Sequence, residues 1–375
     1  MPRKVTLTAK FEDARNALRN SMIDRDAEID VVLTALICQE NPVLVGAPGT
    51  GKSMLLDGLL KWMDKASKFN LCFNRFTTPE EVFGPISVQG MKNDEYRRVT
   101  TGKLPEADVA FFDEVFKANS AILNAMLRIL NEGVYEKGDG TYQECPLRIG
   151  VAASNEWPEQ EELGALFDRF LFRKTVAPVS QAKLDDLLWT NHEGPKFKHT
   201  ITSAELDKAH QEAMALEFSD QAKESFRNII EELLKKGVQP GDRRMVKSIG
   251  AAKGFAWLNG DKVVQPEHLT ILQHTLWDDP NEQPAIVRKV VLQYANPVSM
   301  KVADLTSKAL DVVRKNEPTE RVPKLQLILT DLKAIQDDLA FEASAAVHDE
   351  VELACTDVAA MIAKAYNQVI GYEVS

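Results

Sequence analysis

The sequence predicts an α/β domain with a parallel sheet, followed by an all-helical domain and a C-terminal helical region. Between residues 42 and 178, short apolar runs alternate with helical patterns. Continuous apolar strands separated by helices are typical of a parallel sheet that is covered on both faces. The strand signal fades after Pro178, and residues 284–375 have the pattern of long helices broken near 316–318. We therefore expect domains at 1–180, 181–283 and 284–375.

The individual elements follow from local periodicity. Residues 11–40 are predicted to be helical, because apolar residues recur there at helical spacing, namely Ile29, Val32, Leu33 and Leu36. The strand candidates are the apolar runs 43–45, 71–76, 109–112 and 149–153. Residues 202–280 are predicted to be helical. In the C-terminal region an amphipathic helix is predicted by an apolar stripe of Leu325, Ile328, Leu329, Leu332 and Ile335.

Two segments interrupt the alternation of strands and helices. Residues 85–101 have the pattern of two strands around a Lys-Asn-Asp turn at 92–94. Residues 133–148, with Gly138-Asp139-Gly140 in the middle, have the pattern of a second hairpin. Both are insertions into the alternating pattern of strands and helices.

The composition limits the classes of protein. The chain has 375 residues, of which 44% are hydrophobic and 27% are charged, as in soluble globular proteins. Its net charge of −11 argues against broad binding to nucleic acid or anionic membranes. The four cysteines lack metal-site spacing, and no signal-like or membrane-spanning apolar run is present. We expect a reduced, cytoplasmic protein without a zinc site.

The most specific motif follows the first predicted strand and fits G-x-x-x-x-G-K-[ST]. Its residues are Gly46, Ala47, Pro48, Gly49, Thr50, Gly51, Lys52 and Ser53, and a helical pattern starts at Met54. Strand, glycine-rich loop and helix together form the context of a phosphate-binding loop. Lys52 would reach the β- and γ-phosphates of ATP, and the Ser53 hydroxyl would hold Mg²⁺. The alternative, an ordinary glycine-rich turn, does not require this lysine and hydroxyl.

Two further strands end in polar side chains that suit nucleotide hydrolysis. Asp113 and Glu114 follow the run 109–112. Asp113 would organise Mg²⁺, and Glu114 would orient and deprotonate the attacking water. Asn155 follows the run 149–153 and could bind the γ-phosphate or this water. Strands also end in acids or Asn for structural reasons. These two motifs therefore indicate nucleotide hydrolysis only in combination with the phosphate loop.

Arginines supply the remaining candidates. Arg169 lies between apolar residues at a predicted helix end, which suits insertion into the phosphate site of a neighbouring subunit, and Arg173 competes for this role. Arg243 and Arg244 start a helix in the second domain, where one of them could contact the γ-phosphate across the domain cleft. A solvated basic helix start is the simpler explanation of that pair.

The order of these motifs resembles the MoxR family of AAA+ ATPases, and within it the RavA-like branch. Matching segments include 46–53, 75–87, 102–107, 112–114, 121–124, 151–156, 168–170 and 242–244, and the resemblance covers about residues 15–280. It implies that Lys52 and Ser53 belong to Walker A, and that Asp113 and Glu114 belong to Walker B. It further implies that Asn155 is sensor 1, Arg169 the arginine finger and Arg243, or else Arg244, sensor 2.

The resemblance also implies an assembly and a role. Family members form rings, usually hexamers, with ATP and Mg²⁺ at subunit interfaces, and the inserts at 85–101 and 133–148 resemble the pore-facing helix-2 insert and pre-sensor-1 hairpin. They act as chaperone-like remodellers of protein clients, often with a von Willebrand factor A domain partner. Residues 284–375 do not match the long C-terminal arm of RavA, so its recruiting role is not transferred.

Two alternatives remain at this stage. One is a DNA translocase, favoured only by a small basic cluster of Lys92, Arg97, Arg98 and Lys103. The other is a nucleotide-gated scaffold in which hydrolysis times assembly. Stimulation of hydrolysis by DNA or by a partner protein would separate the first alternative from the others.

Overall fold

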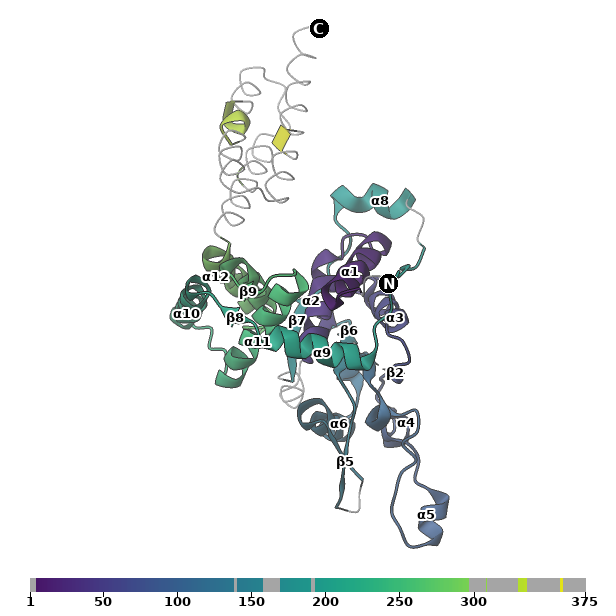
Figure 1. Cartoon of the computed structure of the whole chain (residues 1–375). Coiled ribbons are helices and arrows are strands. Elements are labelled where there is room, and N and C mark those ends of the chain that lie inside the picture. The colour runs from purple at the N-terminus through teal and green to yellow at the C-terminus, as the bar shows by residue number, and fades with distance from the viewer. Residues whose placement is uncertain are drawn as a thin grey trace. The chain divides into compact units, whose positions relative to one another are not determined.

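Five parallel strands form the sheet of the α/β domain. The computed structural model describes residues 5–137, 140–157, 169–189 and 193–296, together with 308, 330–335 and 358–359. The strand order is β2-β3-β6-β1-β7 (Figure 1). The bounds are Asn41–Val45 for β1, Lys68–Cys72 for β2, Val109–Asp113 for β3, Ile149–Ser154 for β6 and Phe170–Thr175 for β7. Since β1 pairs with a strand on each side and is buried throughout, the predicted parallel sheet is confirmed.

Three of the predicted strands, 43–45, 109–112 and 149–153, coincide with β1, β3 and β6. The candidate at 71–76 was placed too late in the chain. Strand β2 starts at Lys68, which pairs with Val109, and its pairing with β3 ends at Cys72. Strand β7 was not among the candidates, because Arg173 and Lys174 interrupt its apolar pattern.

The helices predicted over 11–40 are α1 (Leu7–Ser21) and α2 (Asp26–Cys38). Helix α2 was expected to bury one face, but it is buried at every position from Glu28 to Cys38 except Asp30. The reason is that α2 packs against β1, α1 and two helices of the second domain, α9 (Ser203–Met214) and α11 (Asp242–Leu258).

Other elements of the α/β domain are short or lie near the phosphate loop. They are α3 (Lys52–Trp62), α6 (Ser120–Glu132), and the 3₁₀ helices η1 (Leu104–Glu106) and η2 (Val115–Lys117). The aromatic ring of Phe11 on α1 lies edge-on to Trp62 of α3 and to Trp257 of α11, with centroids 4.9 and 5.1 Å apart. One buried ring therefore joins three helices across the domain boundary.

The segment 85–101 is not the predicted hairpin. It follows α4 (Pro79–Phe83), contains the short helix α5 (Val88–Lys92) and closes with an antiparallel bridge between Ile86 and Arg98. Helix α5 begins here because the Ser87 hydroxyl accepts a hydrogen bond from the Gly90 N–H, 3.1 Å away. Gly84 is required at the base, since its φ is 94° and a Cβ would lie 1.9 Å from the Val99 carbonyl oxygen.

The second predicted insert is confirmed as a hairpin. Strands β4 (Val134–Glu136) and β5 (Tyr142–Glu144) pair antiparallel. Two residues of its turn, 138 and 139, lie outside the described residues. In Figure 1, this hairpin and the α5 segment extend from the same end of the α/β domain.

The predicted helical second domain is confirmed, apart from a two-residue parallel pair formed by β8 (Glu217–Phe218) and β9 (Val263–Val264). Its other elements are η3 (Gln181–Lys183), α8 (Leu184–Trp189), α9, α10 (Asp220–Lys235), α11 and η4 (Pro266–His274). Helix α12 (Gln283–Ala295) follows. Helix α9 has a capping box, in which Thr202 and Glu205 satisfy each other's backbone N–H groups.

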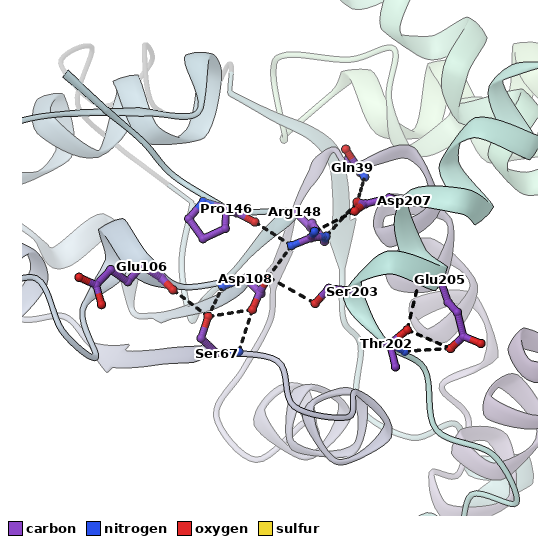
Figure 2. A network of polar contacts seen from close by, with 10 residues as sticks. All are labelled: Gln39, Ser67, Glu106, Asp108, Pro146, Arg148, Thr202, Ser203, Glu205 and Asp207. Carbon is purple, nitrogen blue, oxygen red and sulfur yellow. Dashed lines mark hydrogen bonds and ion pairs between the residues drawn. The ribbon is translucent and has the colours of Figure 1, made fainter.

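A polar network fastens α9 to the amino-terminal edge of the sheet (Figure 2). Arg148, which precedes β6, donates to both carboxylate oxygens of Asp207 on α9 at 2.9 and 2.8 Å. The same guanidinium forms a short ion pair with Asp108 at the start of β3, and Asp108 also accepts from Ser67 and Ser203. The helical domain is therefore fixed to its own sheet by charged contacts as well as by apolar packing.

The described chain separates into two compact units, Met1–Glu224 with Leu233–Val287, and Ser225–Glu232 with Arg288–Ser375. The predicted boundaries near 180 and 283 remain predictions. Of the predicted C-terminal stripe, only Leu332 and Ile335 lie among the described residues. They belong to a helical segment at 330–335, in which Leu332 is buried.

Candidate functional site

The phosphate-loop segment connects β1 to α3 and has the backbone shape that phosphate binding requires. Gly49 and Gly51 have φ values of 79° and 85°, a region that favours glycine. Gly46 approaches β7 so closely that a Cβ would lie 2.2 Å from the Val176 carbonyl oxygen. The loop then leads into the N-terminus of α3, where free N–H groups and the helix dipole favour an anion.

Lys52 is the first residue of α3, directly after this loop, and is largely buried. Its ammonium donates to the carbonyl oxygens of Gly46 at 2.5 Å and Ala47 at 3.1 Å, and to Asn155 Oδ1 at 3.2 Å. Burial lowers the pKa of Lys52, while the nearby carboxylates of Glu114 and Asp113 act in the opposite direction. A cation held by neutral carbonyls can exchange them for the oxygens of a phosphate.

The two predicted carboxylates lie at the end of β3, where Asp113 is its last residue and Glu114 follows it. Asp113 Oδ1 accepts from the backbone N–H of Glu114 at 3.1 Å. Glu114 has a φ of 52°, the left-handed region, which costs a residue with a side chain about 1–3 kcal/mol. Its carboxylate accepts from Asn155 Nδ2 and forms an ion pair with Lys117 at 3.1 Å. These three contacts hold an acid group beside the lysine of the loop.

Asn155 contacts both Lys52 and Glu114. Its side-chain oxygen faces Lys52 and its side-chain nitrogen faces Glu114. Because β1, β3 and β6 are parallel, their carboxyl ends meet at one edge of the sheet, and this brings the three residues together. The structure thus assembles Lys52, Asp113, Glu114 and Asn155, as the sequence predicted.

The donor set fits a magnesium nucleotide. Burial and, to a smaller extent, the charge of Glu114 raise the pKa of Asp113, so both burial and the neighbouring carboxylate disfavour its charged form. A divalent cation would relieve this repulsion, and hydroxyl and carboxylate oxygens such as those of Ser53 and Asp113 are ligands that Mg²⁺ prefers. The glycine loop offers N–H groups to phosphates, while Met54 at its end is half exposed.

Arg169 lies far from this cluster. It immediately precedes β7, whose first residue Phe170 pairs with Asn41 at the amino-terminal edge of the sheet, whereas Val45 pairs with Thr175 at the opposite edge. At about 3.3 Å per residue, roughly 13 Å of strand separates the two edges. The predicted helix end preceding Arg169 falls in residues 158–168, outside the described part of the chain.

Arg173 and Arg244 are structural in this arrangement. Arg173 is 1% exposed, and its guanidinium pairs with Asp278 at 2.7 Å and lies 5.7 Å from the centre of the Trp277 ring. Arg244 is 4% exposed and donates to the Leu171 and Thr275 carbonyl oxygens at 3.0 and 2.9 Å. Both arginines join β7 to the helical domain.

Arg243 is exposed and donates to Asn131 Oδ1 at 3.2 Å, near the end of α6. Its neighbour Arg244 is bound to residues at the start of β7, so this pair also lies at the amino-terminal edge of the sheet. In this arrangement Arg243 therefore lies away from the phosphate loop of its own subunit, and its role as sensor 2 stays a prediction.

Sequence reasoning missed two residues of the site. Arg25, between α1 and α2, is 6% exposed and donates from Nε to the Thr50 carbonyl oxygen of the loop at 2.9 Å. Lys117 forms the ion pair with Glu114. The spacing of Lys117, three residues after Glu114, was available as a signal, whereas nothing near Arg25 in the sequence points to the loop.

Within the ranges that the structure describes, no helix has the length and apolar character needed to cross a membrane. The same residues contain no group of three His, Cys, Asp or Glu side chains arranged to hold a metal ion.

Comparisons with known proteins agree on one family. Residues 9–214 match the model of the MoxR domain in the MoxR-vWA-beta-propeller ternary systems, and residues 224–291 match an AAA lid domain. Two uncharacterized proteins of Methanocaldococcus jannaschii are similar to this chain. One is 40% identical over 79% of this chain and 77% of its own, and the other is 41% identical over 72% of each.

A solved structure shows the same fold. It is the crystal structure of a proposed ATPase from Cytophaga hutchinsonii, which is 15% identical in sequence and superimposes with a TM-score of 0.61. The alignment covers 77% of this chain and 95% of the solved one.

Proposed function

This chain belongs to the MoxR family of AAA+ ATPases, and from that premise we propose that it is a ring-forming enzyme that hydrolyses ATP in the cytoplasm and remodels a protein client. The observation that carries the proposal is the contact chain Lys52–Asn155–Glu114 beside the glycine loop. In this cluster Lys52 would bind the phosphates, Asn155 would sense the bound nucleotide and Glu114 would act as the base. The finer assignment to the RavA-like branch remains a prediction.

The residues of the cluster divide the chemistry between them. Bound MgATP supplies the phosphoryl group that is transferred to water, and Ser53 and Asp113 would hold the metal. Lys52 and the loop N–H groups would bind the phosphates. Glu114 would orient the attacking water and accept its proton, with Asn155 and Lys117 fixing the carboxylate. Before hydrolysis, Lys52 and Asn155 must release each other to face the nucleotide.

A ring is proposed because the two arginines predicted to act on a γ-phosphate lie away from the phosphate loop of their own subunit. Arg169 and Arg243 both lie at the sheet edge opposite Lys52. Within one subunit they do not reach the pocket in this arrangement. Each could instead stabilise the transferring phosphoryl group of a neighbouring subunit, as a finger and a sensor. A hexamer is the proposed assembly, by family resemblance.

The proposed partner is a protein with a von Willebrand factor A domain, since the matching family model describes MoxR domains of MoxR-vWA systems. A DNA translocase is the runner-up, and a nucleotide-gated assembly scaffold is the third possibility. The net charge of −11 disfavours the translocase.

Phosphate release by the purified full chain tests this function. We expect Mg²⁺-dependent hydrolysis that increases with a von Willebrand factor A domain protein encoded near this chain and is unchanged by single- or double-stranded DNA. A change in the protease sensitivity of the partner during hydrolysis would distinguish remodelling from scaffolding. Lys52→Ala is the inactive control. Stimulation by DNA alone would establish the translocase, and no hydrolysis under any condition would refute the enzyme assignment.

A further inference from the structure

A cavity of about 430 Å³ lies between the α5 segment, α4, α6 and the β4–β5 hairpin. Arg98 and Tyr96 reach it from the α5 segment, Phe83 from α4, Arg128 from α6, and Tyr135 and Lys137 from the hairpin region. The four elements are near one another at one end of the α/β domain in Figure 1. The volume is within the range of specific ligand sites, about 300–1,000 Å³.

The lining of this cavity has a charge opposite to that of the chain. It contains three cations, Arg98, Arg128 and Lys137, and one carboxylate, Glu136. The whole chain carries −11. A positive cavity on an acidic protein attracts negative groups.

One of these arginines can change partners. Arg128 bonds Glu136 at 2.5 Å and the Tyr142 hydroxyl at 2.9 Å, but Arg128 and Glu136 are 45% and 50% exposed. Ion pairs this exposed contribute only about 0–1 kcal/mol, so an incoming carboxylate can replace Glu136 at little cost. Arg98 is less exposed, donates to the Gly84 carbonyl oxygen at 2.8 Å and forms an ion pair with Glu80 at 3.2 Å, so its position is fixed and its charge is partly neutralised.

The floor of the cavity suits an aromatic or aliphatic side chain. The rings of Phe83 and Tyr135 stack with centroids 5.5 Å apart and an angle of 16°. Ile122 also lines the cavity and is buried. Exposed Val88 and Met91 of α5 extend the apolar character beyond the cavity. Aromatic residues and arginine are enriched among the residues that contribute most to binding at protein–protein interfaces.

We propose that this cavity binds an extended acidic segment of a protein, with an apolar side chain on the Phe83–Tyr135 floor and carboxylates on Arg128 and Lys137. The inference rests on the proposed function as a protein remodeller and names the chemistry of the segment that it engages. Binding would also bridge the α5 segment and the hairpin, which are separate excursions of the chain.

Fluorescence anisotropy of the full chain without nucleotide tests the cavity. The probe is a fluorescein-labelled peptide with a central phenylalanine flanked by glutamates. The double variant Arg128→Glu with Lys137→Glu should bind the peptide at least about tenfold more weakly. Lys92→Glu, which makes half of this charge change on α5 and outside the lining, should bind it within about twofold of wild type. Glu136→Gln should bind it more tightly, because Arg128 loses its internal competitor.

Three results would overturn the proposal. The first is equal binding of a peptide with glutamine in place of glutamate. The second is unchanged binding by the double variant, and the third is preferential binding of a single-stranded oligonucleotide that the same variants abolish. Basal ATP hydrolysis is measured on every variant. Since the peptide assay contains no nucleotide, a failed peptide result leaves the ATPase proposal standing, and a failed ATPase result leaves the cavity testable.

Discussion

At the scale of single residues, the site depends on one amide group. Asn155 accepts from Lys52 and donates to Glu114, so the same side chain keeps a cation and a candidate base in position. Glu114 is additionally held in a left-handed backbone conformation. Strain of this kind persists only where neighbouring contacts fix it, and here the contacts are those of Asn155 and Lys117.

We predict that Glu114→Gln binds ATP but hydrolyses it at least about a hundredfold more slowly, because the amide preserves the shape but does not accept a proton. Lys52→Ala should instead weaken binding, since the phosphates lose their principal cation. A fluorescent nucleotide measures affinity, and phosphate release measures turnover. Turnover of Glu114→Gln near the wild-type rate would show that another group is the base.

At the scale of elements, Arg148 determines how α9 sits on the sheet. The guanidinium joins the start of β6 to Asp108 of the α/β domain and Asp207 of α9 (Figure 2). Its hydrogen bonds lower the pKa of Asp207. The folded state therefore favours the ionised carboxyl, which links the stability of this contact to pH.

We predict that Arg148→Met lowers the free energy of unfolding by about 1–2 kcal/mol at pH 7, because part-buried Asp108 loses its partner, while solvent screens the loss at the more exposed Asp207. The lowered pKa of Asp207 means that its contribution is complete above the unfolded pKa of about 3.9 and disappears as pH falls through the folded value. The difference from wild type should thus be constant from about pH 8 to 5 and should shrink in more acidic solution. Urea denaturation at several pH values measures it, with Lys92→Met as the exposed control. A difference that grows on acidification would contradict this assignment.

At the scale of the whole molecule, the arrangement of arginines supports the proposal that a complete site draws on more than one subunit. Arg173 and Arg244 are buried in the contact between β7 and the helical domain. Arg169 and Arg243 remain as candidates to act on a nucleotide, and both lie at the edge of the sheet away from their own phosphate loop.

We predict that Arg169→Ala folds and binds ATP but hydrolyses it poorly, because charge on the transferring phosphoryl group is left unstabilised. Mixing it with Lys52→Ala should restore part of the activity, since an intact pocket then meets an intact arginine. ATPase assays across mixing ratios measure this effect. If activity does not recover at any ratio although the two variants assemble together, the proposal that Arg169 alone acts on the site of a neighbouring subunit is contradicted. Arg173→Ala is the comparison variant and should lose stability instead.

The sequence by itself determined the parts of this protein that depend on contiguous residues. The phosphate loop needs glycines, a lysine and a hydroxyl in fixed order, and apolar runs before it, before Asp113 and before Asn155 predicted β1, β3 and β6. Because parallel strands end at one edge, the assembly of Lys52, Glu114 and Asn155 was also predictable.

Only the tertiary structure decided the features whose partners come from distant parts of the chain. Strand β7 contains the buried Arg173, whose guanidinium forms an ion pair with Asp278 and lies over the ring of Trp277. The α5 segment turns into a helix under the cap of Ser87 and closes on its own base at Gly84. Arg243 and Arg244 are adjacent, and the sequence does not distinguish them. Arg244 is buried and donates to carbonyl oxygens of β7 and of the loop after η4, whereas Arg243 is exposed. The free energy of burying an arginine depends on the hydrogen-bonding and charged groups that surround it. Tertiary packing, rather than the neighbouring residues in sequence, determines which groups these are.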